Sequence, residues 1–171
     1  MKVLFLDIDG VLNANDDFGG RSKPNPFVVS NSGVQYCGIS TSKVKRLSRI
    51  IKETAAKIVL VSTWKDDYED YLHGYKNRIG KYLYNKLRKQ GLVILDTTYR
   101  FSHGFHSHRG AEISTWLANQ DEPIESWIVL DDEIFGDYGP TIMSNLILTS
   151  DVDGLTDCLV NKAIEKLNIR R

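Results

Sequence analysis

The sequence predicts an α/β protein in which a mostly parallel, five-stranded sheet carries helices on both faces. Short apolar runs at residues 2–8, 57–62, 92–96, 127–131 and 145–149 alternate with segments of helical periodicity. The first run is apolar at successive positions, as in a strand that is covered on both faces. Several runs end in polar side chains, and open sheets of this class bind ligands at the carboxyl ends of their strands.

The first strand ends in two aspartates, Asp7 and Asp9, followed by Gly10. Their i, i+2 spacing directs both carboxylates to the same side, where each raises the cost of ionising the other unless a cation compensates. A hard divalent cation such as Mg²⁺ suits two such carboxylates. The alternative is a polar strand-to-loop turn that Gly10 closes.

An insert at about residues 13–40 separates the first strand from the first helix, which is expected at about 41–55. It is too long for an ordinary connection and too short for a separate cap domain. Two mostly apolar stretches, 27–30 and 34–37, flank Asn31-Ser32-Gly33, a pattern typical of a β-hairpin. We expect this hairpin to form a flap over the strand ends; the alternative is a structural hairpin packed on the sheet edge.

Two further helices are expected, one from Arg109 to about Asn119 and a last one that starts at Thr156. The segment from Tyr71 to Gln90 lies between the first helix and these two helices. It is rich in lysine, arginine and tyrosine and has no acidic residue. Such a segment can follow a nucleic-acid backbone and stack bases. The favoured interpretation is a helix whose basic charges complement its dipole and whose apolar residues face the core.

The second and fourth strands also end in groups that suit a phosphate site. Ser62, Thr63 and Lys65 follow the second strand, and Asp131 and Asp132 end the fourth. Ser62 and the N–H groups beside it can stabilise a phosphate oxygen at a strand-to-helix turn. Thr63 is a second candidate for this contact, or alternatively the N-cap of the following helix.

Arg109 stands at the start of its helix. It either supplies a fixed positive charge to a phosphoryl group or is a surface arginine, because the helix dipole disfavours a cation there unless an anion lies close. Lys65 is the alternative phosphate partner. Just before Arg109, the residues His103, His106 and His108 invite a zinc site, but no cysteine or acid completes a tetrahedral set nearby. A substrate-binding loop ending in His108 is the preferred interpretation.

The four groups, taken in order, resemble the motifs of the haloacid dehalogenase (HAD) superfamily of phosphoryl-transfer enzymes: DxD, a strand-end Ser or Thr, a Lys or Arg, and an acidic pair. The phrases at 6–12, 62–65, 109–117, 130–133 and 154–156 are similar to one branch, the small HAD-like domain of "Swiss Army knife" RNA-repair proteins. This resemblance covers nearly the whole chain and implies a Rossmann-like HAD fold. Most HAD families have lysine where Arg109 stands.

The resemblance implies a Mg²⁺-dependent phosphatase that hydrolyses phosphomonoesters through an aspartyl-phosphate. Asp7 would be the nucleophile, and Asp9 would protonate the leaving alcohol and later activate water. Mg²⁺ would be held by Asp7, the main-chain carbonyl of Asp9 and Asp131, with Asp132 nearby. The catalytic set is then Asp7, Asp9, Ser62 and Arg109, and the substrate-binding set is Gly10, Thr63, Lys65 and His108.

HAD enzymes that carry only a flap look open to large substrates, so the resemblance points to a nucleotide or to the phosphorylated end of a nucleic acid. Two other classes stay open. A phospho-accepting receiver domain uses similar strand-end groups but has no use for Asp9, and a catalytically silent module would keep the fold alone.

Length and composition predict one domain over residues 1–171, since 171 residues with 42% hydrophobic content can enclose a single core. The 22 basic and 22 acidic residues balance, so no overall charge favours nucleic acid or a membrane. Cys37 and Cys158 lie far apart, which favours reduced thiols in the cytoplasm. No signal-peptide pattern or membrane-spanning run is present, so we expect a cytoplasmic protein without a membrane partner, and the oligomeric state stays open.

Overall fold

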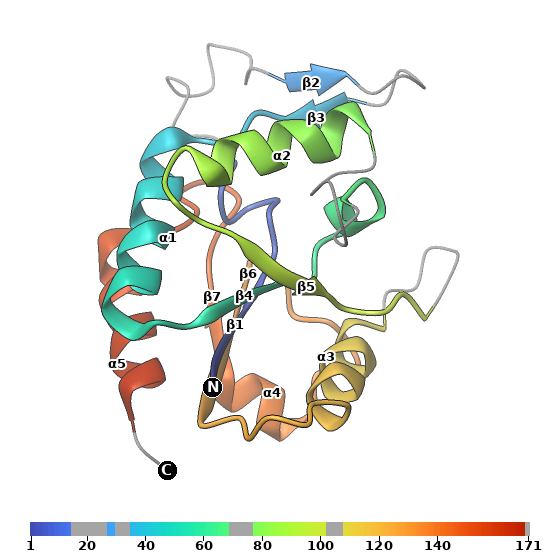
Figure 1. Cartoon of the computed structure of the whole chain (residues 1–171), viewed down its shortest axis with the longest axis vertical. Coiled ribbons are helices and arrows are strands. Elements are labelled where there is room, and N and C mark those ends of the chain that lie inside the picture. Colours follow the sequence, from blue (N-terminus) through green and yellow to red (C-terminus); the bar gives the residue numbers. More distant parts are fainter. Residues whose placement is uncertain (15–26, 30–34, 69–76, 102–107, 170–171) are drawn as a thin grey trace.

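A single five-stranded sheet forms the centre of the protein (Figure 1). The computed structural model describes residues 1–14, 27–29, 35–68, 77–101 and 108–169. The strand order is β5-β4-β1-β6-β7, and every neighbouring pair is parallel. The strands are β1 (Lys2–Leu6), β4 (Lys57–Leu60), β5 (Ile94–Thr97), β6 (Ser126–Asp131) and β7 (Leu146–Leu148). The predicted α/β class with a parallel sheet is therefore confirmed.

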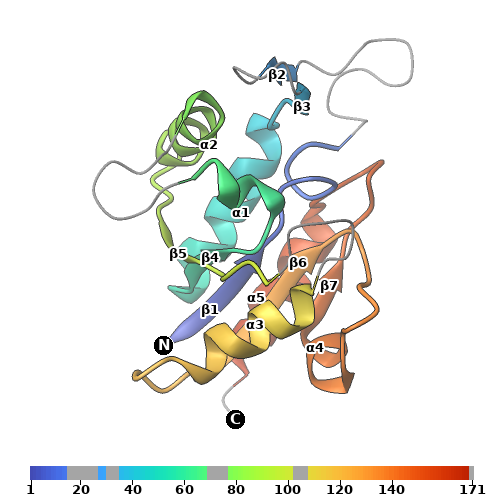
Figure 2. The same ribbon diagram turned by 90° about the vertical axis from the view of Figure 1, so that its right-hand side faces the viewer.

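Helices cover both faces of the sheet (Figures 1 and 2). One face packs against α1 (Thr41–Thr54), α2 (Arg78–Arg88) and α5 (Asp157–Asn168), and the other against α3 (Arg109–Ala118) and α4 (Pro140–Asn145). Each face of the sheet has its own hydrophobic core: the first core lies under α1, α2 and α5, and the second lies under α3 and α4. Successive side chains of β1 point to opposite faces, so Leu4 and Leu6 enter the first core and Val3 and Phe5 enter the second. Strand β1 is therefore apolar at every position that is buried.

Aromatic contacts fix α3 against the sheet. Phe5 packs edge-on against Trp116 of α3, with ring centroids 5.4 Å apart. The indole N–H of Trp116 donates a hydrogen bond of 2.7 Å to Asp96 of β5. These contacts join the C-terminal half of α3 to the sheet.

Each predicted apolar run differs from its strand by one or two residues at one or both ends. Strand β5 begins at Ile94 instead of residue 92, because Gly91 ends the α2 segment at φ +72° and Leu92 N–H donates back to the carbonyl of Leu87 at 3.2 Å. Strand β7 begins after Asn145, which closes α4. The short helix α4 itself was not predicted.

The predicted hairpin pairing is present as β2 (Phe27–Val29) and β3 (Gln35–Cys37), two antiparallel strands. The turn expected at residues 31–33 lies outside the described residues. Figures 1 and 2 place the hairpin beyond the carboxyl end of β1, and in Figure 1 it lies directly above α2. Its role as a flap stays a prediction.

Helix α2 packs as a core helix. Ile79, Leu83 and Leu87 are buried in the first core. The Tyr82 hydroxyl accepts a hydrogen bond of 2.9 Å from the N–H of Ile39, so this ring joins α2 to the start of α1. The core-facing interpretation of this segment therefore holds for its described part.

In the described part of the chain, no helix combines the length and the hydrophobicity that crossing a bilayer requires.

Candidate active site

Three carboxylates meet at the carboxyl ends of β1 and β6. The N–H of Asp7 donates to the carbonyl of Leu130 at 2.9 Å, which extends the β1–β6 pairing and sets Asp7 beside Asp131. Asp132 follows directly, and one oxygen from each of the three carboxylates lies within 4.8 Å of the others. Asp7 is 4% exposed and Asp131 fully buried. The sheet thus brings together acids that lie more than 120 residues apart in the sequence.

Arg109 reaches into this cluster from the first position of α3. Its Nη1 lies 3.0 Å from Oδ1 of Asp7 and 2.7 Å from Oδ2 of Asp131. The residue is only 6% exposed, so the alternative of a surface arginine is wrong. Burial lowers the pKa of Arg109, but the charges of Asp7 and Asp131 together raise it by more than burial lowers it. The guanidinium therefore stays charged. The two aspartates are the anions that make a cation acceptable at a helix N-terminus.

Negative charge in the cluster exceeds what Arg109 neutralises. Burial raises the pKa of Asp7 to about 7; Arg109 and a hydrogen bond with Ser62 oppose the rise, and Asp131 and Asp9 add to it. The pKa of Asp132 is also raised, first by burial and then by Asp131. Asp7 and Asp131 are buried and Asp132 is half-buried, so a further cation would stabilise the ionised forms of these carboxyls.

The donor set fits a hard divalent cation. Asp7, Asp131 and Asp132 offer adjacent carboxylate oxygens, the ligands that Mg²⁺ prefers. Gly10 makes room for this arrangement, because it adopts φ +62° and a Cβ there would lie 2.1 Å from Oδ2 of Asp132. The hydroxyl of Thr149 holds the Gly10 carbonyl at 2.8 Å. Gly10 therefore shapes the cluster, and its predicted substrate contact stays a prediction.

Asp9 is exposed and its carboxylate is held by residues outside the three-carboxylate cluster. The indole Nε1–H of Trp64 donates to Oδ2 at 3.0 Å, and the Nδ2 amide of Asn13 donates to Oδ1 at 2.5 Å. Asn13 in turn accepts the N–H of Gly10 at 2.9 Å. Each oxygen of Asp9 thus accepts a hydrogen bond that fixes its position. Sequence reasoning missed Trp64 and Asn13 as partners of Asp9.

The strand-end segment after β4 forms a 3₁₀ helix, Thr63–Asp66. Ser62 is its N-cap: the buried hydroxyl accepts from Trp64 N–H at 3.4 Å and also bonds Asp7. The alternative of Thr63 as the N-cap is therefore wrong, and Thr63 is an exposed residue of the first turn.

Lys65 forms its ion pair with Glu112, outside the acid cluster. Its Nζ forms a buried salt bridge with Glu112 of α3 and donates to the Thr98 hydroxyl at 3.0 Å. Burial lowers the pKa of Lys65, and Glu112 opposes that shift. Arg109, and not Lys65, is the base whose side chain the structure sets against Asp7.

His108 is exposed and is the N-cap residue of α3, although its side chain makes no capping bond. The preceding residues 102–107, with the other two histidines of the predicted loop, lie outside the described residues.

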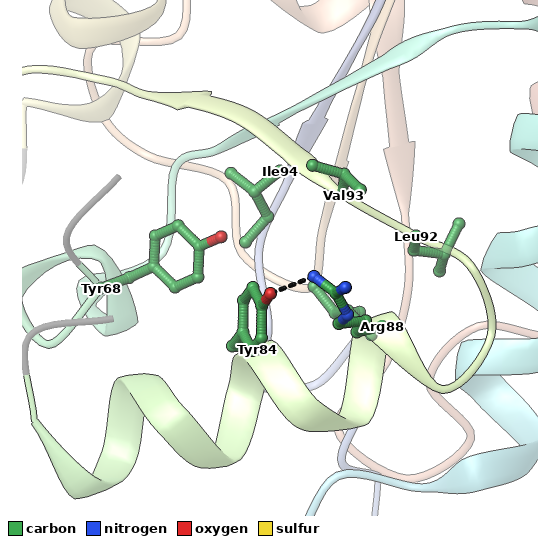
Figure 3. Close-up of a pocket in the computed structure, with 7 residues that line it drawn as sticks. Tyr68, Tyr84, Arg88, Leu92, Val93 and Ile94 are labelled. Carbon is green, nitrogen blue, oxygen red and sulfur yellow. Dashed lines mark hydrogen bonds between the residues drawn. The ribbon is translucent and has the colours of Figure 1, made fainter. Parts of the chain in front are cut away.

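A shallow pocket lies away from the acid cluster, between α2 and β5 (Figure 3). Tyr84 and Arg88 of α2 face Val93 and Ile94 across it, and Tyr68 closes one end. None of the predicted site residues lines this pocket, so it is distinct from the candidate active site.

The family model described as "HAD domain in Swiss Army Knife RNA repair proteins" matches residues 3–160. The chain belongs to this family. The matched range runs from β1 into α5 and includes every residue of the acid cluster and Arg109. Membership in this HAD family supports a HAD-type hydrolase in general terms. No curated protein and no solved structure matches the chain.

Proposed function

We propose that this HAD domain is a Mg²⁺-dependent phosphatase that hydrolyses phosphomonoesters through an aspartyl-phosphate on Asp7. The observation that carries the proposal is the bridge that Arg109 makes between Asp7 and Asp131, at 3.0 and 2.7 Å, inside a buried group of carboxylates. A carboxylate nucleophile and a phosphate repel each other, so such a reaction needs cations at this point.

In the first half of the reaction, a carboxylate oxygen of Asp7 attacks phosphorus and the ester P–O bond breaks. The leaving alkoxide takes a proton from Asp9, whose position Trp64 and Asn13 fix. In the second half, Asp9 takes a proton from water as the water oxygen attacks phosphorus, and the bond from phosphorus to Asp7 breaks. Inorganic phosphate leaves, and Asp9 is protonated for the next cycle.

Asp7, Asp131 and Asp132 would hold Mg²⁺, which supplies charge screening between the carboxylates and the phosphate when it is bound. Arg109 contributes a fixed positive charge. Its Nε–H is buried and has no acceptor among the described residues, so a phosphoryl oxygen is a fitting partner for this guanidinium. Ser62 orients Asp7 through their hydrogen bond.

The proposed substrate is a nucleotide or the phosphorylated end of a nucleic acid. Two observations support this class. The family is described by its occurrence in RNA repair proteins, and the segment between β1 and α1, which is too short for a separate cap domain, carries the β2–β3 hairpin. Thr63 and His108, both exposed, are the proposed outer contacts to such a substrate.

The test is phosphate release with Mg²⁺ or with EDTA from mononucleotides, sugar phosphates, phosphopeptides, and oligonucleotides phosphorylated at either the 5′ or the 3′ end. We expect Mg²⁺-dependent release concentrated on the nucleotides or on one oligonucleotide end, and its loss in Asp7→Asn. The matched control is Asp121→Asn, which changes an exposed carboxyl far from the cluster in sequence. Release from no substrate would overturn the proposal. A phosphoaspartate that survives for longer than minutes would instead assign the receiver class.

A further inference from the structure

The loop between β6 and α4, residues 132–139, surrounds Arg109 with contacts that the proposed chemistry does not yet use. Its Asp137 accepts the N–H of Ala111 at 3.0 Å and so caps the first turn of α3. A Cβ on Gly110 would lie 2.5 Å from the carbonyl oxygen of Asp137. The start of α3, which carries Arg109, is therefore seated directly on this loop.

Phe135 of the same loop covers the face of the guanidinium. The Cζ of Arg109 lies over the Phe135 ring, 4.3 Å from its centroid. A guanidinium has all its N–H groups in its plane and none on its faces. The N–H groups of Arg109 contact Asp7 and Asp131 in the plane of the guanidinium. The Phe135 ring covers one face of the guanidinium, where a hydrogen-bond acceptor would find no N–H group.

The loop fixes the ring as well. Tyr138 N–H donates to the Phe135 carbonyl at 3.0 Å, and the two rings pack with centroids 5.5 Å apart. The Tyr138 hydroxyl donates to Oδ2 of Asp131 at 3.1 Å, the same oxygen that Arg109 contacts. The ring of Phe135 is thus tied to the carboxylate that Arg109 must meet.

We infer that Phe135 is a positioning residue for Arg109, which it holds in the plane that lets the guanidinium contact Asp7 and the transferred phosphoryl group together. The inference rests on the proposed role of Arg109 in phosphate binding. Removing the ring leaves the charge of Arg109 and all three carboxylates in place but frees the guanidinium to rotate. Oxyanion binding and turnover then fall while the affinity for Mg²⁺ stays unchanged.

The experiment compares Phe135→Leu, which removes the ring, with Phe135→Tyr, which keeps it. Ile134→Ala is the matched control, because Ile134 is the neighbouring loop residue and is 52% exposed. Calorimetry gives the dissociation constants of Mg²⁺ and, with Mg²⁺ present, of inorganic phosphate; kcat is measured on the best phosphomonoester. We expect Phe135→Leu to weaken phosphate binding and lower kcat about five- to tenfold, with Mg²⁺ binding unchanged. Phe135→Tyr and Ile134→Ala should match the wild type.

Wild-type phosphate affinity in Phe135→Leu would overturn the inference, as would a parallel loss of Mg²⁺ and phosphate binding that Phe135→Tyr does not rescue. Phe135→Met, close in volume, repeats the test if Phe135→Leu does not fold. If the wild type hydrolyses no ester but Phe135→Leu still weakens phosphate binding alone, the proposed function fails and the positioning role stands.

Discussion

Asp7→Asn should make the metal-free protein more stable at neutral and alkaline pH while it abolishes turnover. The side chain is 4% exposed, and burial raises its pKa to about 7 from an ordinary value of 3.8. An ionised Asp7 is therefore a cost to the folded state whenever no metal ion is bound. Asparagine has nearly the same shape and cannot ionise.

The sign and size follow from proton linkage. Between pH 4 and 7 the folded protein binds the Asp7 proton more tightly than the unfolded chain does, so this carboxyl contributes stability at low pH that is lost as pH rises to about 7. At about 1.4 kcal/mol for each pKa unit, the full loss is about 4 kcal/mol. Because the neutral amide loses the charge attraction of the carboxylate to Arg109, we expect Asp7→Asn to recover about 2–3 kcal/mol of this at pH 8, or roughly 5–10 °C in Tm.

Thermal unfolding followed by circular dichroism from pH 5 to pH 8 in EDTA measures this difference. The gap between Asp7→Asn and the wild type should shrink to less than half at pH 5, and the exposed control Asp121→Asn should follow the wild type throughout. Adding Mg²⁺ at pH 8 should stabilise the wild type more than the variant, since the variant lacks one ligand. A Tm of Asp7→Asn at or below that of the wild type at pH 8 in EDTA would refute the reasoning.

Two further changes probe the residues that support the cluster. Gly10→Ala should weaken Mg²⁺ binding at least tenfold by calorimetry, because the new Cβ would lie 2.1 Å from Oδ2 of Asp132. Gly91→Ala is the control: Gly91 also has a positive φ, but a Cβ there meets no atom within 4 Å. This control should lower the free energy of unfolding by about 1 kcal/mol and leave Mg²⁺ binding unchanged. Trp64→Phe removes the 3.0 Å hydrogen bond to Asp9 and keeps most of the ring. It should lower kcat about tenfold for alkyl phosphates and much less for p-nitrophenyl phosphate, whose leaving group needs no acid, and an equal loss on both substrates would contradict the role of Asp9.

The acid cluster could largely be expected from the sequence, because it depends mainly on which segments form strands and which residues follow them. Each acid follows an apolar strand, and parallel strands present their carboxyl ends at one edge of the sheet. The strand assignment therefore sets Asp7, Asp131 and Asp132 at one edge of the sheet, and the strand order, in which β1 lies between β4 and β6, brings them together. The same reasoning places Ser62 beside Asp7.

The groups that hold the cluster in shape could not be expected in this way. Trp64 reaches Asp9 across 55 positions of sequence, and its role depends on the path of the turn after β4. Phe135 lies in a loop whose pattern predicts no regular element, and only the docking of α3 shows what its ring faces. Side-chain partners of this kind follow from tertiary packing, which periodicity does not encode.

The choice between Arg109 and Lys65 shows how the same packing decides a chemical question. Lys65 follows β4 closely in sequence and Arg109 begins α3, and both side chains become buried. Glu112 lies one turn after Arg109 on α3, and it forms a buried salt bridge with Lys65. Because an ion pair largely cancels its own field, Lys65 adds little positive charge to the cluster. Helix α3 thus directs the charge of Arg109 to Asp7 and Asp131 and, through Glu112, holds Lys65 in a separate pair.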